Sequence, residues 1–244
     1  MSTRKPSPAT IAAEIRQLLK DGGSADHASG VQWFFKDEIK SHGWYTAKLR
    51  SAAVQSRKQI RKEFGLNFLV GVADKLFVGQ VLEEKILAVF LLEKLTDGLG
   101  EAEFRLFESW LSRISSWADH DALVHYLIAP MVAARPARTS RVFRWAKSPH
   151  RWHRRAACVA LIQGTRRKMF LSEIKRLSNV LLFDQDDIVQ KGLGWLLRET
   201  AKADAKRTVP YLMSIRKRAP RLVLRTACET LPVDVRKKIL AKPS

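Results

Sequence analysis

The sequence has few of the residues that mark a disulfide-stapled, metal-bound or membrane-spanning protein. Its 244 residues include two cysteines, Cys158 and Cys228, which can form one disulfide at most and cannot supply a zinc site alone. No apolar run approaches the roughly 20 residues that span a bilayer, and the first residues lead into no secretion signal. We therefore expect a soluble cytoplasmic protein that folds without disulfide bonds or structural metals and has no membrane partner.

Motifs of cofactor and metal enzymes are missing as well. The sequence contains no Walker loop, no glycine-rich dinucleotide fingerprint and no Gly-x-Ser-x-Gly elbow. Its six histidines, at positions 27, 42, 120, 125, 150 and 153, form no His-Glu-x-x-His pair of the kind found in zinc proteases. We predict neither a metal site nor a cofactor.

Strand-like alternation is almost absent, whereas apolar residues recur at helical spacing, as at Phe104, Phe107, Leu111 and Ile114. An internal repeat appears when these helices are aligned on a charged residue followed by three small or apolar residues. The aligned residues are Arg50, Lys85, Asp121, Arg155, Lys191 and Arg225, at intervals of 35, 36, 34, 36 and 34 residues. Each interval has room for two helices and two turns, so that one helix pair can stack on the next.

The repeat predicts an all-α fold, a HEAT-like α-solenoid of about six stacked helix pairs. We expect one domain over residues 1–244, with residues 1–8 as a flexible N-terminus. Cys158 and Cys228 fall at equivalent positions, where the other repeats have Ala53, Ala88, Val124 and Gly194. Small residues at these positions indicate close helix packing, so both cysteines are predicted to be inert core thiols.

The charge balance indicates a polyanionic partner. The chain has 44 Lys and Arg against 24 Asp and Glu, a net charge of +20, and nucleic acid is the first candidate for such a surface. The basic residues are spread over the whole length, which favours a folded basic surface over a charged tail. We expect a basic concave face, with Arg50, Lys85, Arg155, Lys191 and Arg225 along one edge.

Asp121 is the single acid among the six aligned positions. Two interpretations remain open: the carboxylate stabilises a developing cation or orients a water, or it pairs with Arg155 or another neighbouring base as a structural partner. The tryptophans bear on the choice, because Trp117, Trp152 and Trp195 each lie three or four residues from an aligned charged residue. Aromatic rings beside basic groups suit contact with sugars and bases, whereas Trp33, Trp44, Trp110 and Trp145 are interpreted as packing residues.

The segment from Pro149 to Ala157 places Arg151, His153, Arg154 and Arg155 at the start of a helix. Positive charge at that end opposes the helix dipole. A phosphate partner would offset this cost, so the segment is a candidate DNA contact.

Three motifs together resemble the DNA alkylation repair glycosylases of the AlkD type. They are Trp117-x-x-x-Asp121, the stretch 152–157 reading Trp-His-Arg-Arg-Ala-Ala, and the stretch 190–199 reading Gln-Lys-Gly-Leu-Gly-Trp-Leu-Leu-Arg-Glu. The resemblance extends over nearly the whole chain. It implies a HEAT-like enzyme of base excision repair that excises positively charged N3- and N7-alkylated purines from double-stranded DNA, without metal, cofactor or base flipping.

The resemblance also implies roles for individual residues. Asp121 would be the catalytic carboxylate, Trp117 and Trp195 would hold the damaged deoxyribose, and Arg155 would grip the DNA backbone. Further DNA contacts are expected from Trp152, Arg154, Lys191, Arg198, Lys85 and Arg50. We expect a monomer associated with the bacterial nucleoid.

Several alternatives stay open at the level of sequence. Asp119 competes with Asp121 for the catalytic role. A non-catalytic HEAT-like scaffold that binds DNA, RNA or an acidic protein also explains the charge, the repeat and the tryptophans, but not the acid at the aligned position. The sequence leaves undecided which alkyl groups are accepted, whether bulky adducts are tolerated, whether excision activity is retained and whether the DNA is bent.

Overall fold

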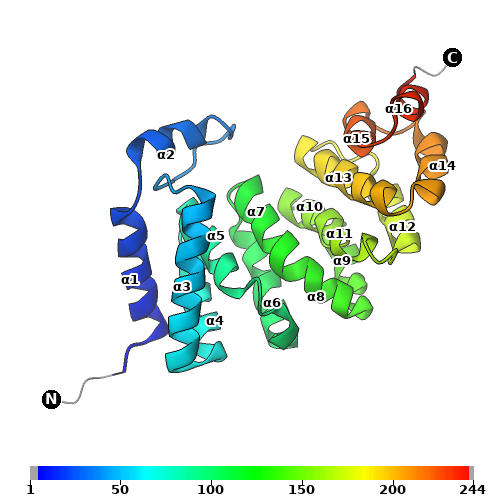
Figure 1. Cartoon of the computed structure of the whole chain (residues 1–244). Coiled ribbons are helices and arrows are strands. Elements are labelled where there is room, and N and C mark those ends of the chain that lie inside the picture. Colours follow the sequence, from blue (N-terminus) through cyan, green and yellow to red (C-terminus); the bar gives the residue numbers. More distant parts are fainter. Residues whose placement is uncertain (1–4, 242–244) are drawn as a thin grey trace. The chain divides into compact units, whose positions relative to one another are not determined.

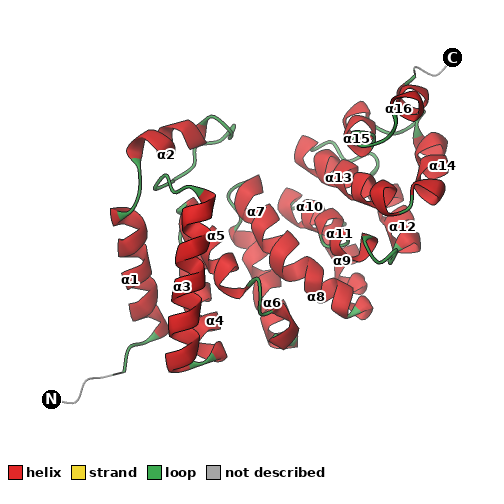
Figure 2. Ribbon diagram, viewed as in Figure 1, coloured by secondary structure: helices red, strands yellow, loops and turns green. Residues whose placement is uncertain are grey.

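The computed structural model describes residues 5–241, and these form helices joined by short loops (Figure 1). Figure 2 shows no strand in this part of the chain. The only strand-like pairing within it is an isolated parallel bridge between Lys40 and Val81. The predicted all-α fold is confirmed.

The chain divides between Leu127 and Ile128 into two compact units, the N-terminal unit and the C-terminal unit. The N-terminal unit contains α1 Pro8–Asp21, α2 Ala25–Gln32, α3 Thr46–Phe64, α4 Leu66–Phe77, α5 Leu82–Leu92, α6 Glu101–Trp110 and α7 Trp117–Leu123. Short 3-10 turns lie at Thr96–Gly98 and Leu111–Arg113, and a π-helical turn at Val124–Ile128 follows α7. The single domain expected over residues 1–244 stays a prediction.

The C-terminal unit contains α8 Ala129–Ala134, α9 Thr139–Trp145, α10 Arg151–Val159, α11 Ile162–Thr165, α12 Leu171–Leu181, α13 Asp187–Ala203, α14 Ala205–Ile215, α15 Arg221–Ala227 and α16 Val233–Leu240. A 3-10 turn at Pro136–Arg138 joins α8 to α9. Of the N-terminal segment expected to be flexible, residues 1–4 lie outside the described residues. α1 begins at Pro8, where the Ser7 hydroxyl accepts a hydrogen bond from the Thr10 N–H at 3.1 Å.

Helices that carry the aligned residues pack against one another in sequence order within each unit. In the N-terminal unit α3 packs on α5 and α5 on α7, with α4 against both α3 and α5. In the C-terminal unit α10 packs on α13 and α13 on α15. This arrangement is what stacked helix pairs produce, and it is consistent with an α-solenoid.

Small residues at the repeat positions allow these helices to approach closely. A Cβ atom added to Gly194 on α13 would lie 2.6 Å from Cβ of Thr226 on α15, a distance at which the helices would have to separate. Cys158 and Cys228 are fully buried. The prediction that both cysteines lie in the core is therefore confirmed. Burial also raises the pKa of the Cys158 thiol to about 12, which disfavours the reactive thiolate.

Candidate functional site

Asp119, near the start of α7, is a buried structural group. Its side chain is 0% exposed, and its two carboxylate oxygens accept hydrogen bonds from the backbone N–H groups of Ser115 and Ser116 at 2.9 and 2.7 Å. The hydroxyls of the same two serines donate to it at 3.1 and 2.6 Å. These bonds complete a capping box that fixes the first turn of α7.

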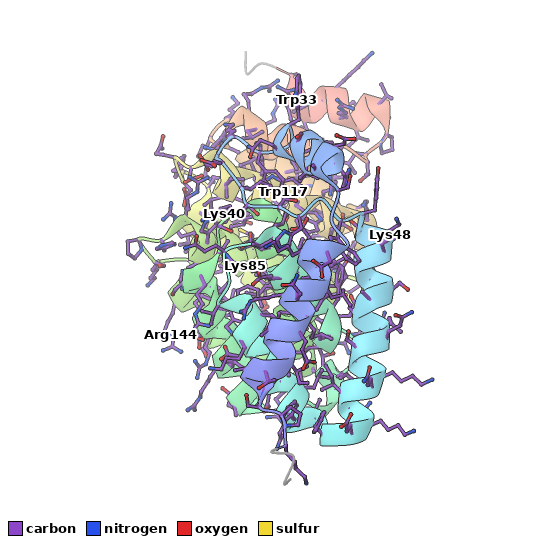
Figure 3. The ribbon with its side chains drawn as sticks, turned by 90° about the vertical axis from the view of Figure 1, so that its left-hand side faces the viewer. Trp33, Lys40, Lys48, Lys85, Trp117 and Arg144 are labelled. Carbon is purple, nitrogen blue, oxygen red and sulfur yellow. The ribbon has the colours of Figure 1, made fainter. Side chains whose placement is uncertain are left out.

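Lys85 supplies the counter-charge to Asp119, since its ammonium nitrogen lies 3.1 Å from the Asp119 carboxylate. The same ammonium donates to the Arg113 carbonyl at 2.5 Å and to the Ser115 hydroxyl at 3.0 Å. Lys85, which Figure 3 labels, belongs to α5 and is 3% exposed. All three of these donor bonds are made inside the protein, and the predicted DNA contact of Lys85 stays a prediction.

Asp121 lies half a turn further along α7 and is accessible from outside. Its side chain is 22% exposed. One carboxylate oxygen lies 2.7 Å from Nδ1 of His120, a side chain that is completely buried. An ionised carboxylate can only accept a hydrogen bond, so Nδ1 of His120 is the donor. His120 thereby fixes the orientation of Asp121, a role that the sequence did not suggest.

Trp117 is the first residue of α7 and lies one helical turn before Asp121, on the same face. It is 40% exposed. Its indole stacks on the ring of Phe35, with centroids 5.0 Å apart and planes inclined by 15°. The sequence placed Trp117 beside Asp121 correctly, but it gave no sign of Phe35, which comes from the loop after α2. The accessible carboxylate of Asp121 and the ring of Trp117, which stacks on Phe35, thus lie on one face of α7.

Arg155 and Trp152 on α10 are buried, at 6% and 8% exposure. The Arg155 guanidinium donates to the Ile188 carbonyl at 2.7 Å, which ties α10 to the start of α13. Gly192 provides the space, because a Cβ there would lie 3.2 Å from Cγ of Arg155. Little of either side chain is exposed, and the DNA contacts expected of them stay predictions.

Arg154 is also engaged within the C-terminal unit. Its Nε lies 2.6 Å from the Asp184 carboxylate, and it donates to the carbonyls of Ser148 and Pro149 at 3.1 and 2.8 Å. Arg151 lies 3.4 Å from Asp186. Asp184 and Asp186 therefore offset part of the positive charge at the start of α10, and the predicted DNA contact of this segment stays a prediction.

The remaining predicted contacts are more accessible. Lys191, Trp195 and Arg198 follow one another along one face of α13. The Lys191 side chain is 46% exposed and lies 3.3 Å from Asp187, Trp195 is half-buried, and Arg198 is 24% exposed and pairs with Glu199 and Glu229. In the N-terminal unit, Arg50 lies 3.9 Å above the Phe90 ring, pairs with Glu93 and is 36% exposed.

Among the four tryptophans interpreted as packing residues, three are confirmed. Trp110 and Trp145 are buried, and Trp44 donates from its indole nitrogen to the Leu19 carbonyl at 2.7 Å. The interpretation is wrong for Trp33, which is 91% exposed. Helical spacing alone does not reveal this, because Trp33 follows the last residue of α2 and points away from it.

The two units differ sharply in charge. Residues 1–127 contain 17 Lys and Arg against 16 Asp and Glu, and residues 128–244 contain 27 against 8. Basic residues are spread along the chain as expected, but the acidic ones gather in the N-terminal unit. The net positive charge therefore belongs almost entirely to the C-terminal unit. The predicted basic concave face stays a prediction.

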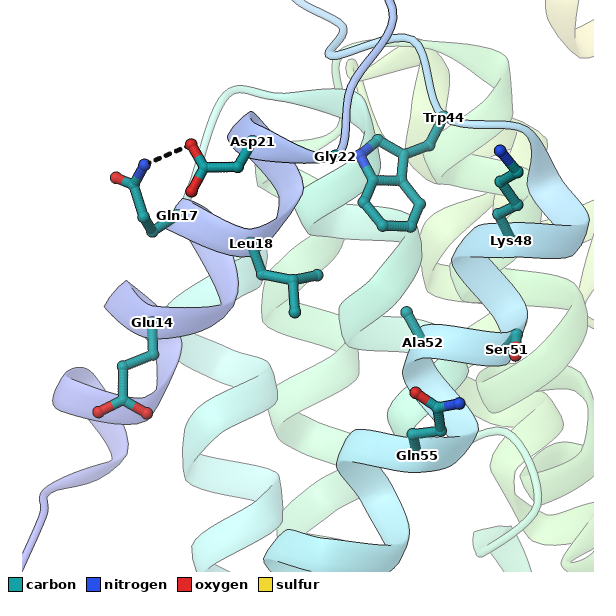
Figure 4. A pocket seen from close by; sticks show the side chains of 10 residues that line it. All are labelled: Glu14, Gln17, Leu18, Asp21, Gly22, Trp44, Lys48, Ser51, Ala52 and Gln55. Carbon is teal, nitrogen blue, oxygen red and sulfur yellow. Dashed lines mark hydrogen bonds between the residues drawn. The ribbon is translucent and has the colours of Figure 1, made fainter.

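A groove of about 910 Å³ lies between the end of α1 and the start of α3, beside Leu18, Trp44 and Lys48 (Figure 4). At its edge Gln17 donates a hydrogen bond to Asp21 at 2.7 Å. None of the residues predicted to carry chemistry lines this groove. Residues 5–241 hold no group of three metal-ligating side chains, and no helix among them has the length and apolarity to cross a membrane.

Two comparisons with known proteins found a match. The model of a protein family described as DNA alkylation repair enzyme matches residues 15–231 of this chain. The fold is similar to that of a solved structure, a predicted DNA alkylation repair enzyme from Enterococcus faecalis, with a TM-score of 0.76 and 16% sequence identity. The similarity covers 86% of this chain and 97% of the other, and at this identity it shows the fold alone. No curated protein matches the sequence.

Proposed function

Since this chain belongs to the family of DNA alkylation repair enzymes, we propose that it is a DNA glycosylase that releases positively charged N3- or N7-alkylated purines from duplex DNA. The observation that carries the proposal is the different environment of two carboxylates on α7. Asp119 is buried and paired with Lys85, whereas Asp121 is accessible one turn from the exposed ring of Trp117.

The proposed substrate needs little catalytic equipment. Alkylation at N3 or N7 makes the purine a cation, and a cationic base leaves its sugar without being protonated first. The enzyme then has to stabilise the positive charge that grows on C1′ and to supply a water. A carboxylate performs both tasks, because it attracts the sugar cation and accepts a proton from the attacking water.

In this proposal each residue on α7 has one role. Asp121 faces C1′ of the damaged nucleotide, and the Trp117 ring, supported by Phe35, presents its π-face to the sugar, where a developing cation is attracted by the ring quadrupole. His120 is a positioning residue that holds one Asp121 oxygen at 2.7 Å. A neutral lesion, whose base has to be protonated before it leaves, should be a poor substrate.

DNA binding in this proposal rests mainly on the charge of the C-terminal unit. Lys191 and Arg198 lie on one face of α13 with Trp195 between them, which suits contact with phosphates and an adjoining sugar. Phosphate contacts position the duplex without reading its sequence. We propose accordingly that the protein works on the DNA of the bacterial nucleoid.

The test is release of 7-methylguanine from methylated duplex DNA by the wild type and by Asp121→Asn. We expect the variant to lose at least about 100-fold in rate, as is usual when a preorganised electrostatic group is removed. Its duplex affinity should be unchanged or slightly higher, because a negative charge has gone. Asp97→Asn is the matched control, since Asp97 is an exposed acid of the same unit, in a 3-10 turn.

Two results would contradict the proposal. If Asp121→Asn excises as fast as the wild type, another group performs the chemistry. If the wild type binds duplex DNA and releases no alkylated base, the non-catalytic scaffold is the better interpretation.

A further inference from the structure

We propose that Trp33 and Phe34 form a stacking site for DNA bases at a weakened base pair, next to the nucleotide that Asp121 acts on. The inference rests on the proposed function and extends it. It concerns a surface that no predicted site residue occupies.

The exposure of these two rings is the starting observation. Trp33 is 91% exposed and Phe34 is 74% exposed, and they are consecutive in the chain. Figure 3 shows Trp33 beyond the end of α2. Large rings that remain in water forgo the stabilisation that burial in the protein core would bring. Contiguous exposed apolar groups of this kind mark interaction sites.

The loop that carries the rings is ordered by its own hydrogen bonds. The side-chain amide of Gln32 donates to the Asp37 carbonyl at 3.0 Å, and its oxygen accepts from the Ile39 N–H at 3.0 Å. The N–H groups of Phe34 and Phe35 donate to the carbonyls of Val31 and Gln32 at 3.1 and 3.0 Å. Because the loop is ordered before any partner arrives, little entropy is lost on binding.

The far end of the loop is fastened to α5. Glu83, which is 4% exposed, accepts hydrogen bonds from the backbone N–H groups of His42, Gly43 and Trp44 at 3.0, 2.9 and 3.2 Å. Gly43 has a φ of +76°, a conformation in which a Cβ would lie 2.0 Å from the Ser24 carbonyl oxygen. Lys40 completes the attachment, because its carbonyl accepts from the Leu82 N–H at 2.8 Å.

The loop is continuous with the candidate catalytic face. Phe35, the next residue after the exposed pair, stacks on Trp117. Trp33, Phe34 and Phe35 are consecutive residues of one short turn, so the exposed pair lies next to the ring that stacks on Trp117. A nucleotide held against Trp117 and Asp121 would therefore have its neighbours within reach of Trp33 and Phe34.

The charge pattern points to bases as the groups that these rings contact. The loop carries Lys36 and Lys40 but also Asp37 and Glu38, and the whole N-terminal unit is nearly neutral, with 17 basic and 16 acidic residues in 1–127. A surface of this kind gains little from phosphates. Aromatic side chains gain instead by stacking on bases, and every base has a suitable face.

A weakened base pair is the expected target because its bases are easiest to reach. Inserting a side chain between intact base pairs requires that the bases be unstacked, which costs free energy. That cost is smaller where the base is damaged, mismatched or missing. A site built from Trp33 and Phe34 would thus favour DNA that contains a lesion over intact DNA.

The experiment measures binding to two duplexes of the same sequence, one intact and one with a stable tetrahydrofuran abasic nucleotide. We expect the wild type to prefer the abasic duplex. Trp33→Ala and Phe34→Ala should each weaken binding to it by at least about fivefold, the lower bound for one stacked base, with little change on the intact duplex. Trp33→Phe should restore much of the preference. Phe183→Ala, at a ring that is 59% exposed in the other unit, is the matched control.

The outcomes separate this inference from the proposed function. If the variants bind both duplexes as the wild type does, the stacking site is refuted, even where excision depends on Asp121. If the preference depends on Trp33 but no base is released, the stacking site stands and the glycosylase proposal falls. A supporting result requires that the variants melt at the same temperature as the wild type. We expect this, because both rings are highly exposed. If the preference falls only together with the melting temperature and Trp33→Phe restores neither, the rings are structural and the inference is refuted.

Discussion

Asp119→Asn and Asp121→Asn should have opposite effects, although the two residues lie within one turn of the same helix. Asp119→Asn should lower thermal stability while the folded fraction stays active. Asp121→Asn should slow excision by at least about 100-fold with little change in stability. The contrast follows from burial, because the Asp119 side chain is 0% exposed and that of Asp121 is 22% exposed.

The magnitude for Asp119 follows from its partners. Its carboxylate accepts four hydrogen bonds from Ser115 and Ser116 and faces the Lys85 ammonium at 3.1 Å. An asparagine has a single oxygen for these donors and leaves the Lys85 charge unpaired. Breaking a buried ion pair from one side costs about 3–5 kcal/mol. At about 2–4 °C per kcal/mol, the melting temperature should fall by about 6–20 °C.

Asp121→Asn removes much less from the folded state. The amide oxygen of asparagine can still accept the hydrogen bond from His120, and part of the side chain is in water. We expect a change within about 1 kcal/mol, as is usual for partly exposed substitutions. Melting curves and base-release assays on both variants, with rates expressed per folded protein, give the comparison.

A double variant tests the physical cause. Lys85→Met removes the stranded charge, so Asp119→Asn combined with Lys85→Met should melt above Asp119→Asn alone. A coupling energy of about 0.5–3 kcal/mol is the usual range for residues in contact. The reasoning is refuted if Asp119→Asn has the same melting temperature as the wild type but loses excision activity. Asp119 would then be the catalytic carboxylate.

Three further predictions concern other parts of the molecule. The logarithm of duplex affinity should fall linearly with the logarithm of salt concentration, and Lys191→Ala should make the slope shallower by about 0.9 if the ammonium contacts one phosphate; an unchanged slope would remove Lys191 from the interface. His120→Ala should misplace Asp121 and so slow excision by about 10- to 100-fold, while the affinity for duplex DNA stays unchanged. A loss of affinity as large as the loss of rate would contradict a positioning role. Burial raises the pKa of Cys158 to about 12 and also raises that of Cys228, so a thiol reagent at pH 8 should modify neither until the protein unfolds; rapid labelling of the native protein would show that these thiols are accessible.

The parts of this protein that depend on local pattern could be predicted from the sequence. Apolar residues at helical spacing determine that the chain forms helices. The six aligned positions led to the helices that pack in order within each unit, and the small residues at Cys158, Gly194 and Cys228 lie buried as expected. The same motifs led to the family, because sequence similarity accumulates along the chain and does not require knowledge of contacts.

The environment of each charged or aromatic side chain was decided only by the tertiary structure. Lys85 looked like one more surface base of the repeat, yet α5 carries it into contact with Asp119, 34 residues away. Trp33 looked like a packing residue and is exposed, whereas Phe35, two residues later, meets Trp117 across 82 residues of sequence. Helical periodicity is a local property of neighbouring residues, but the burial of a charge or a ring depends on which distant segments pack around it. The difference in burial between Asp119 and Asp121 is of this second kind, since both lie on one short helix and only the packing of α5 against α7 makes one of them inaccessible.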